Sequence, residues 1–244
     1  MKKLWLLILL FCFFVVQGCY YSSAQYVNRG LGKQLKGDLE GAIADYTKAI
    51  QANPNNSIAF YNRGLAKQKM SDLDGAIEDY TKAVEIDQKF SKAYLNRGII
   101  RHQSGDFVGA LADYEKAVEL NQDDADVYYN RGILKMDDLD YSGAILDFNM
   151  AIKINPKYAA AYKICGDVKF QMDDLDGAAA DYSKAITVDP KCALAYYNRG
   201  IVWERKKEYS SAINDFQKAA EIDPQFKKKA DKRIKNCMSQ LKRK

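Results

Sequence analysis

The sequence predicts an all-α fold made of repeated helical hairpins. Three observations point to it: a strict repeat, helical spacing of apolar residues and an ordinary composition. Glycine recurs at one constant interval without an insertion, at positions 30, 64, 98, 132, 166 and 200. Within the second half of a repeat, apolar residues such as Ile77, Tyr80 and Val84 follow near-helical spacing. The 244 residues are 48% hydrophobic and 28% charged, which is typical of a globular chain and excludes a multi-pass membrane protein. We therefore expect two antiparallel helices per repeat, stacked so that neighbours bury each other's apolar faces.

Residues 1–18 precede the repeats and have the features of a secretory signal peptide. Lys2 and Lys3 come before an apolar run at 4–16, which as a helix spans about 20 Å and falls short of a bilayer's hydrocarbon core. Residues 16–19 (Val-Gln-Gly-Cys) resemble the lipobox of bacterial lipoproteins. That resemblance implies cleavage before Cys19, diacylglycerol on its thiol, and a short lipid tether at 19–22. The alternatives are a plain signal peptide or an uncleaved anchor, with Cys19 an incidental thiol.

Small and aromatic residues recur at fixed offsets from each glycine. An alanine follows at the twelfth and at the nineteenth position, an aromatic residue at the sixteenth, and a proline at the twenty-fourth in four of the six copies. This pattern resembles the tetratricopeptide repeat (TPR) family, whose fold is a right-handed α-solenoid of helix–turn–helix units. The resemblance covers six consecutive units: 23–56, 57–90, 91–124, 125–158, 159–192 and 193–226.

Three further features predict how each hairpin is held together. A mid-helix glycine costs about 1 kcal/mol relative to alanine, so we expect the two helices to approach closely, with Gly30 facing Ala42. Turns such as 37–39 (Gly-Asp-Leu) end one helix with a flexible residue and start the next with an acidic cap. An Arg before the glycine and an Asp before the aromatic residue are expected to pair. In the fifth unit Cys165 replaces this Arg.

Residues 227–244 are predicted to form a basic amphipathic helix that caps the array. Its apolar residues step by three or four: Ala230, Ile234, Cys237, Met238 and Leu241. The segment holds nine basic side chains and one acidic one, whereas the whole chain has a formal charge of +5, so the repeats are net acidic. This asymmetry argues against a nucleic-acid-binding face on the repeats. The basic residues either keep the cap soluble or contact an anionic surface.

The residue types predict neither a catalytic site nor a metal or cofactor site. His102 is the only histidine, which excludes any His pair, and we expect no enzymatic activity. Residues 173–177 (Asp-Asp-Leu-Asp-Gly) look like a calcium loop, but matching turns in other units identify them as an inter-helix turn with capping carboxylates. Cys165, Cys192 and Cys237 show no metal-ligand spacing, and the first two either pair in an oxidising space or pack as free thiols.

The TPR resemblance implies that the working surface is the concave groove lined by the first helices. Its exposed positions lie three residues before each glycine and one after it, and five of six residues in each row are apolar or aromatic. The predicted groove residues are Tyr61, Leu65, Leu95, Ile99, Tyr129, Ile133, Lys163, Asp167, Tyr197 and Ile201. We expect tyrosines to act as hydrophobic anchors, although packing between units would use the same residues. Lys163 and Asp167 either neutralise each other or fix a partner's charged end.

Together these features predict a membrane-tethered scaffold that binds a peptide or helix of a partner protein in its groove. The alternative is a structural, self-associating cell-envelope lipoprotein, or a regulator of an envelope (cell-wall) enzyme. The lipobox resemblance implies a bacterial cell envelope. In the lipoprotein family an Asp after the cysteine favours the inner membrane, so the resemblance with Tyr20 at this position implies the outer membrane, facing the periplasm. The alternative is a secreted protein or one anchored by an uncleaved signal. No nucleic-acid partner is expected.

Overall fold

The computed structural model describes residues 21–242, so the predicted signal and Cys19 lie outside the described residues. Within that range all regular structure is helical, with thirteen α-helices and one 3-10 turn. Two compact units divide the chain, Met1–Ser104 and Gly105–Lys244. We call them the N-terminal and the C-terminal unit and describe each by itself.

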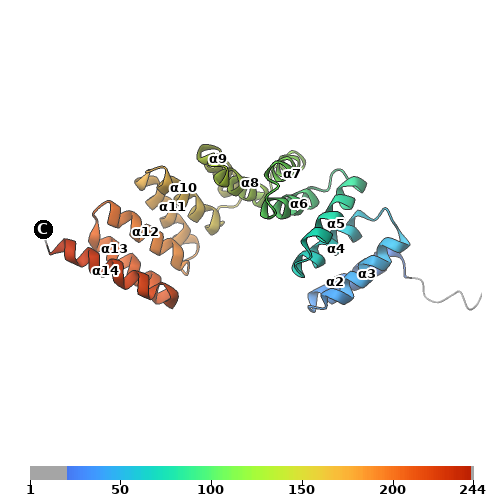
Figure 1. The fold of residues 1–244 in the computed structure, drawn as a ribbon, viewed down its shortest axis with the longest axis horizontal. Coiled ribbons are helices and arrows are strands. Elements are labelled where there is room, and N and C mark those ends of the chain that lie inside the picture. The colour runs from blue at the N-terminus through green and yellow to red at the C-terminus, as the bar shows by residue number, and fades with distance from the viewer. Residues whose placement is uncertain (1–20, 243–244) are drawn as a thin grey trace, which may run out of the picture. The chain divides into compact units, whose positions relative to one another are not determined.

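The N-terminal unit holds two complete hairpins and the first helix of a third (Figure 1). Its helices are α2 (Ser23–Leu35), α3 (Leu39–Ala52), α4 (Ser57–Lys69), α5 (Leu73–Ile86) and α6 (Ser91–Gln103). Each helix packs on the next one in the chain, and α2 also contacts α4. First helices therefore neighbour first helices, which is the arrangement of a helical-repeat stack.

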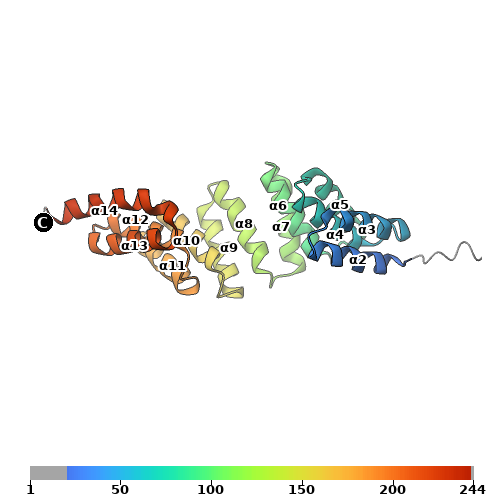
Figure 2. The same ribbon diagram turned by 90° about the horizontal axis from the view of Figure 1, so that it is seen from below.

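The C-terminal unit continues this pattern from α7 to α14 (Figure 2). Its elements are α7 (Phe107–Leu120), α8 (Ala125–Asp137), α9 (Tyr141–Ile154), α10 (Ala159–Gln171), α11 (Leu175–Val188), α12 (Ala193–Arg205), α13 (Tyr209–Ile222), the 3-10 turn η1 (Pro224–Phe226) and α14 (Lys227–Leu241). Consecutive helices pack on one another up to α13 and α14. The predicted fold class, an all-α solenoid of TPR hairpins with a terminal helix, is confirmed.

The apolar face predicted for the terminal helix is only partly correct. Ala230 and Cys237 are buried against α13, two helical turns apart and therefore on one line along the helix. Met238 and Leu241 are 46% and 40% exposed. Met238 is turned by about 100° from Cys237, because each residue advances an α-helix by that angle. The buried stripe of α14 is therefore narrower than its sequence pattern predicted.

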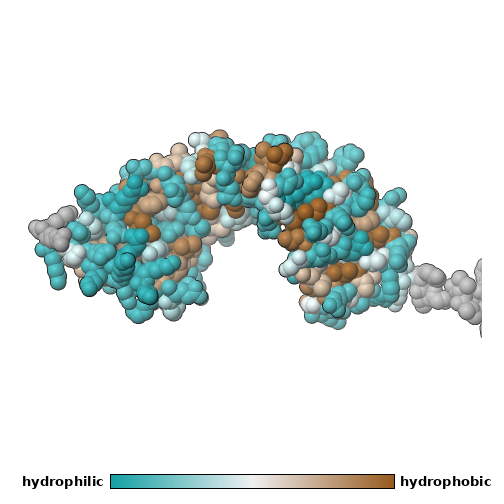
Figure 3. Space-filling view, in the orientation of Figure 1, coloured by the Kyte–Doolittle hydropathy of each residue, from teal (hydrophilic) through white to brown (hydrophobic). Residues whose placement is uncertain are grey.

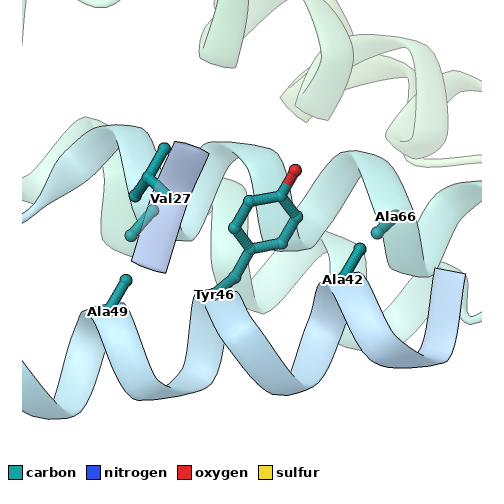
Figure 4. Close-up of a cluster of buried hydrophobic side chains, with 6 residues drawn as sticks. Val27, Ala42, Tyr46, Ala49 and Ala66 are labelled. Carbon is teal, nitrogen blue, oxygen red and sulfur yellow. The ribbon is translucent and has the colours of Figure 1, made fainter. Parts of the chain in front are cut away.

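Each hairpin closes on an aromatic ring from its second helix. Tyr46 is fully buried in a cluster with Val27, Ala42 and Ala49 (Figure 4). A Cβ atom at Gly30 would lie 2.6 Å from Cε1 of the Tyr46 ring, well inside van der Waals contact. The same contact recurs at Gly64 with Tyr80, Gly132 with Phe148, Gly166 with Tyr182 and Gly200 with Phe216. The helices approach closely at Gly30, as expected, but the nearest atoms of the second helix belong to Tyr46 rather than to Ala42. The ring lies one helical turn beyond that alanine and is large enough to reach across the gap.

The turns inside the hairpins share one backbone geometry. Gly37 and Gly105 adopt left-handed φ values of 83° and 84° just before the second helix begins. The equivalent residues of four other hairpins are left-handed without being glycine: Ser71, Leu139, Asp173 and Lys207. An Asp follows in five units and caps the second helix, as in Asp174, whose Oδ1 accepts from the Gly177 amide at 2.9 Å. This confirms residues 173–177 as a capped turn.

Buried carboxylates bind basic side chains across the hairpins, as predicted. Asp45 is 1% exposed and accepts from Nε of Arg29 at 2.7 Å, while Nζ of Lys33 lies 3.0 Å from the same carboxylate. Equivalent Arg–Asp pairs join residues 63 and 79, 131 and 147, and 199 and 215. In the fifth unit Nζ of Lys169 lies 2.6 Å from Asp181, so this carboxylate keeps a cation without the Arg. Burial raises the pKa of the adjacent Cys165 thiol to about 12.

Two glycines of α2 provide a matched test of the ring contact. Gly30→Ala would drive a methyl group into the Tyr46 ring, and overpacking of this kind costs about 1–3 kcal/mol. A Cβ atom at Gly32 meets no heavy atom within 4 Å, so Gly32→Ala should gain up to about 1 kcal/mol from helix propensity alone. Urea unfolding of both variants measures the difference. Equal stability of the two variants would contradict the close approach.

Because of the Asp45 carboxylate, the stability of the hairpin should depend on pH. Its pKa is lowered because Arg29 and then Lys33 donate hydrogen bonds to the charged form, which outweighs the cost of burial. A depressed pKa stabilises the fold above the unfolded-state pKa of about 3.9, and this contribution is lost as the pH falls through the folded-state value. The Tm of Asp45→Asn should therefore be below wild type at neutral pH, and the gap should shrink below about pH 4. Exposed Asp74→Asn serves as the control.

Candidate functional site

The ten predicted groove residues all lie on first helices, and we call them the first-helix row. In the N-terminal unit they come from α4 and α6, and in the C-terminal unit from α8, α10 and α12. Leu95 is buried, with 7% exposure, and offers almost no surface. The other nine residues are half-buried. Each of these therefore has a packed side and a side that reaches the surface.

Three tyrosines of the row recur at every second repeat. Each of them packs against two further aromatic rings. The centroid of Tyr61 lies 5.8 Å from that of Tyr80 in the same hairpin and 4.7 Å from that of Phe90, which precedes the next first helix. Tyr129 repeats this with Phe148 at 6.0 Å and Tyr158 at 4.9 Å, and Tyr197 with Phe216 at 5.4 Å and Phe226 at 5.1 Å. These tyrosines join one hairpin to the next and are held in place before any partner arrives.

Hydroxyl groups of this set also bond to the following first helix. The Tyr61 hydroxyl accepts from Nδ2 of Asn96 at 3.0 Å. The Tyr197 hydroxyl accepts from Nε of Arg233 at 3.2 Å, and the Arg233 guanidinium lies over the Tyr197 ring. Burial raises the pKa of Tyr129, so its hydroxyl is neutral at ordinary pH. The row therefore combines apolar ring faces with hydroxyl groups.

Asp167 is the polar centre of the row in the C-terminal unit. Its Oδ2 accepts from Nζ of Lys163 at 2.9 Å, which supports the reading that the two charges neutralise each other. Its Oδ1 accepts from the Tyr182 hydroxyl at 2.7 Å and from Nδ2 of Asn198 at 2.9 Å. The pKa of Tyr182 is raised, first by burial and then by the charge of Asp167. Asp167 thus links α10 with α11 and α12.

Surface hollows follow this row in the C-terminal unit. One of about 370 Å³ lies beside Asp167 and is lined by Phe170, Gln171, Tyr182, Asn198 and Ile201. A second, of about 460 Å³, lies on the other side of α10, where Ile164, Val168 and Tyr141 give it an apolar wall. Hydrophobic side chains reach the surface among hydrophilic ones over both units (Figure 3). The hollows can take up side chains of a bound segment, and they hold no constellation that suggests covalent chemistry.

The sequence interpretation overlooked a third hollow, between α12 and α14. It has a volume of about 360 Å³ and is lined by Tyr197, Lys229, Lys232, Arg233 and Asn236. A signal for it was present, because Arg233 follows Arg199 by one full repeat period and so holds the position of the recurrent arginine. The aromatic partners Phe90, Tyr158 and Phe226 were overlooked too. They recur only in every second repeat, at twice the period on which the interpretation rested.

The remaining candidate groups are dispersed. Cys165 and Cys237 are buried and Cys192 is half-buried, and all three are free thiols. His102 is half-buried on α6. Across residues 21–242, His, Cys, Asp and Glu side chains form no group of three suited to a metal ion. None of the helices in this range combines the length and the apolar character needed to cross a bilayer.

Comparisons with known proteins agree with the hairpin geometry. A "TPR repeat" family model matches residues 35–71 and 100–137, and two "Tetratricopeptide repeat" models match 57–90 and 166–225. A comparison with curated proteins found no match. Proteins with this repeat are typically non-enzymatic scaffolds for protein–protein interaction, and the TPR fold suggests an interaction scaffold for this chain.

Solved structures extend the likeness over most of the chain. The crystal structure of MamA is 30% identical, with a TM-score of 0.63 over 68% of this chain and 96% of that one. The crystal structure of YrrB, a TPR protein, is 25% identical, with a TM-score of 0.63 over 77% of this chain and 97% of that one. The PilF structure from Pseudomonas aeruginosa shares the fold alone, at 17% identity and a TM-score of 0.74 over 83% and 92%. Given the matching repeat models and the MamA likeness, the chain belongs to the tetratricopeptide repeat family.

Proposed function

We propose that this protein is a scaffold that binds a peptide or helix of a partner protein along the first-helix row of its C-terminal unit. The observation that carries the proposal is that row residues Asp167 and Ile201, together with the half-buried apolar side chains Ile164 and Phe170, border surface hollows on α10 and α12. Such a surface binds by apolar contact, and the intervening polar groups set the register.

The aromatic contacts support this proposal by fixing the tyrosines in advance. Tyr129 and Tyr197 are each held between two rings, so little side-chain entropy is lost when a partner covers their free side. The structure of YrrB is described as having an unusual peptide-binding site. That likeness supports a peptide ligand for this chain too.

Substitutions on the first-helix row should weaken partner capture. Ile201 lines the hollow beside Asp167, and Ile133 is half-buried at the matching position of α8. We expect Ile133→Ser/Ile201→Ser to weaken capture by at least about tenfold, because loss of two apolar contacts of about 1–2 kcal/mol each has that effect. Affinity capture from detergent-solubilised membranes, quantified by mass spectrometry, measures it.

Second helices supply the control for this experiment. Val108 on α7 and Leu146 on α9 are 83% and 67% exposed. Val108→Ser/Leu146→Ser makes the same kind of change outside the row and should keep the wild-type partners. Thermal melts of both double variants show whether the fold survives. If the two variants lose the same partners while both remain folded, the first-helix row is not the binding surface.

We propose further that the scaffold is tethered to a bacterial outer membrane through a lipid on Cys19 and faces the periplasm. The support is the sequence order of Lys2 and Lys3, the apolar run and the Val-Gln-Gly-Cys motif at 16–19. Two or more acyl chains anchor a protein stably, whereas one gives only reversible binding.

Cys19→Ala should release the protein from the membrane. Wild-type protein is expected to incorporate radiolabelled palmitate and to enter the detergent phase in Triton X-114 partitioning. The variant should lose the label, because the thiol that carries the diacylglycerol is absent. Cys165→Ala, which removes a buried thiol, should leave the label unchanged. A labelled Cys19→Ala protein would contradict the tether.

A further inference from the structure

The terminal helix occupies the place of a seventh first helix. It begins at Lys227, one full repeat period after α12 begins at Ala193, and it packs on α13. Arg233 holds the position of the recurrent arginine, but it makes different contacts from the others. It donates to the Tyr197 hydroxyl at 3.2 Å and to Glu204, and its guanidinium lies over the rings of Tyr197 and Phe216. The first-helix row therefore leads from Tyr197 onto the surface of α14.

A cationic hollow lies where α12 and α14 meet. Four of its lining residues, Lys229, Lys232, Arg233 and Asn236, belong to α14 and are spaced as one face of a helix. The fifth is Tyr197 of the first-helix row. No carboxylate lines this hollow, and Lys229 and Lys232 are exposed and form no ion pair with any residue between 21 and 242. Glu204 compensates only Arg233, which leaves two uncompensated positive charges.

Lys229 also stands where its charge does not help the helix. The first turn of α14 contains Lys227, Lys228 and Lys229 and no acidic residue. Cations at a helix N-terminus oppose the macrodipole, at about 0.3–1 kcal/mol each on an exposed surface. The adjacent Phe226 provides no side-chain cap. Lys227 is offset by Asp231, whose carboxylate lies 3.3 Å from its Nζ, whereas Lys229 has no such partner in the described part of the chain. An anionic ligand near Lys229 would gain from both the charge and the dipole.

We propose that this hollow binds a carboxylate-rich segment of the partner protein, next to the part that occupies the first-helix row. The inference rests on the proposed function and adds the chemistry of the ligand. Lys229 and Asn236 are about 10 Å apart along the helix axis, which suits two or more carboxylates of an extended segment rather than one small anion. Arg233 is held in position by Tyr197 and Glu204, so it is ready to donate to a carboxylate.

A charged peptide provides the probe. The full-length protein in mild detergent should bind a fluorescein-labelled hexaglutamate peptide, as followed by anisotropy, and should bind the matching hexaglutamine peptide at least about tenfold more weakly. Raising the salt from about 0.1 M to about 1 M should abolish the difference, because it shortens the screening length from about 10 Å to about 3 Å.

Matched lysine pairs locate the site. Lys229→Gln/Lys232→Gln removes two charges from the hollow and should weaken hexaglutamate binding about tenfold. Lys228→Gln/Lys235→Gln removes two exposed charges of the same helix that do not line the hollow, and should weaken it less than about threefold. Equal losses in the two variants would overturn the proposal, because they would indicate general attraction to a basic helix.

A lipid competitor separates a peptide ligand from a membrane. Dihexanoyl-phosphatidylglycerol, which is soluble as a monomer, should not displace bound hexaglutamate. Displacement by this lipid, or absence of peptide binding by the wild type, would overturn the assignment to an acidic segment. The proposed function would still stand if Ile133→Ser/Ile201→Ser lost its partners, so the two proposals fail separately.

Discussion

In the five hairpins that lie within one unit, an aromatic ring from the second helix leaves no room for a Cβ atom at a glycine of the first helix. This contact sets the distance between the two helices, because any side chain at the glycine would displace the ring. It also sets the position of the tyrosine hydroxyl at the far end of the ring. The hydroxyl of Tyr46 donates to Gln34 at 2.9 Å and that of Tyr80 to Gln68 at 2.8 Å. Tyr61 of the first-helix row then packs on the Tyr80 ring. The position of a surface residue thus follows from a buried contact.

In the fifth unit this arrangement lacks the glutamine that accepts a hydrogen bond from the tyrosine hydroxyl. Phe170 stands where Gln34 and Gln68 stand in the first two units, so the Tyr182 hydroxyl loses its usual acceptor. Asp167 supplies a new one at 2.7 Å, at a position that is apolar in the other units. Lys163 then balances the charge of Asp167. Asp167 therefore has a structural role. A partner would reach its carboxylate from the adjacent hollow, which Asp167 lines.

The 34-residue period was sufficient to predict the helices, the acidic caps and the Arg–Asp pairs, because each depends on neighbours at fixed sequence offsets. It did not predict which residue meets the glycine, since Ala42 and Tyr46 lie on the same helix face and only size decides which one reaches across. The sequence pattern located Ala230 and Cys237 on the buried face of α14 but made that face too wide, because Met238 and Leu241 are exposed. Lys229 occupies the position at which Ala59 and Ala195 are buried, and α14 instead buries Ala230, one residue further on. This difference leaves Lys229 and Lys232 facing the hollow.

The dual role of the tyrosines bears on where partner specificity resides. Tyr61, Tyr129 and Tyr197 each bridge two hairpins, so changing them alters the fold together with any binding surface. Specificity can vary more freely at row positions that make no aromatic bridge between hairpins, such as Ile133 and Ile201, and at the charges of α14. A scaffold built in this way keeps rigid aromatic platforms in every second repeat and differs between partners in the residues around them. Because the platforms are already ordered, binding energy is not spent on fixing them, and small differences among the surrounding residues decide which segment is bound.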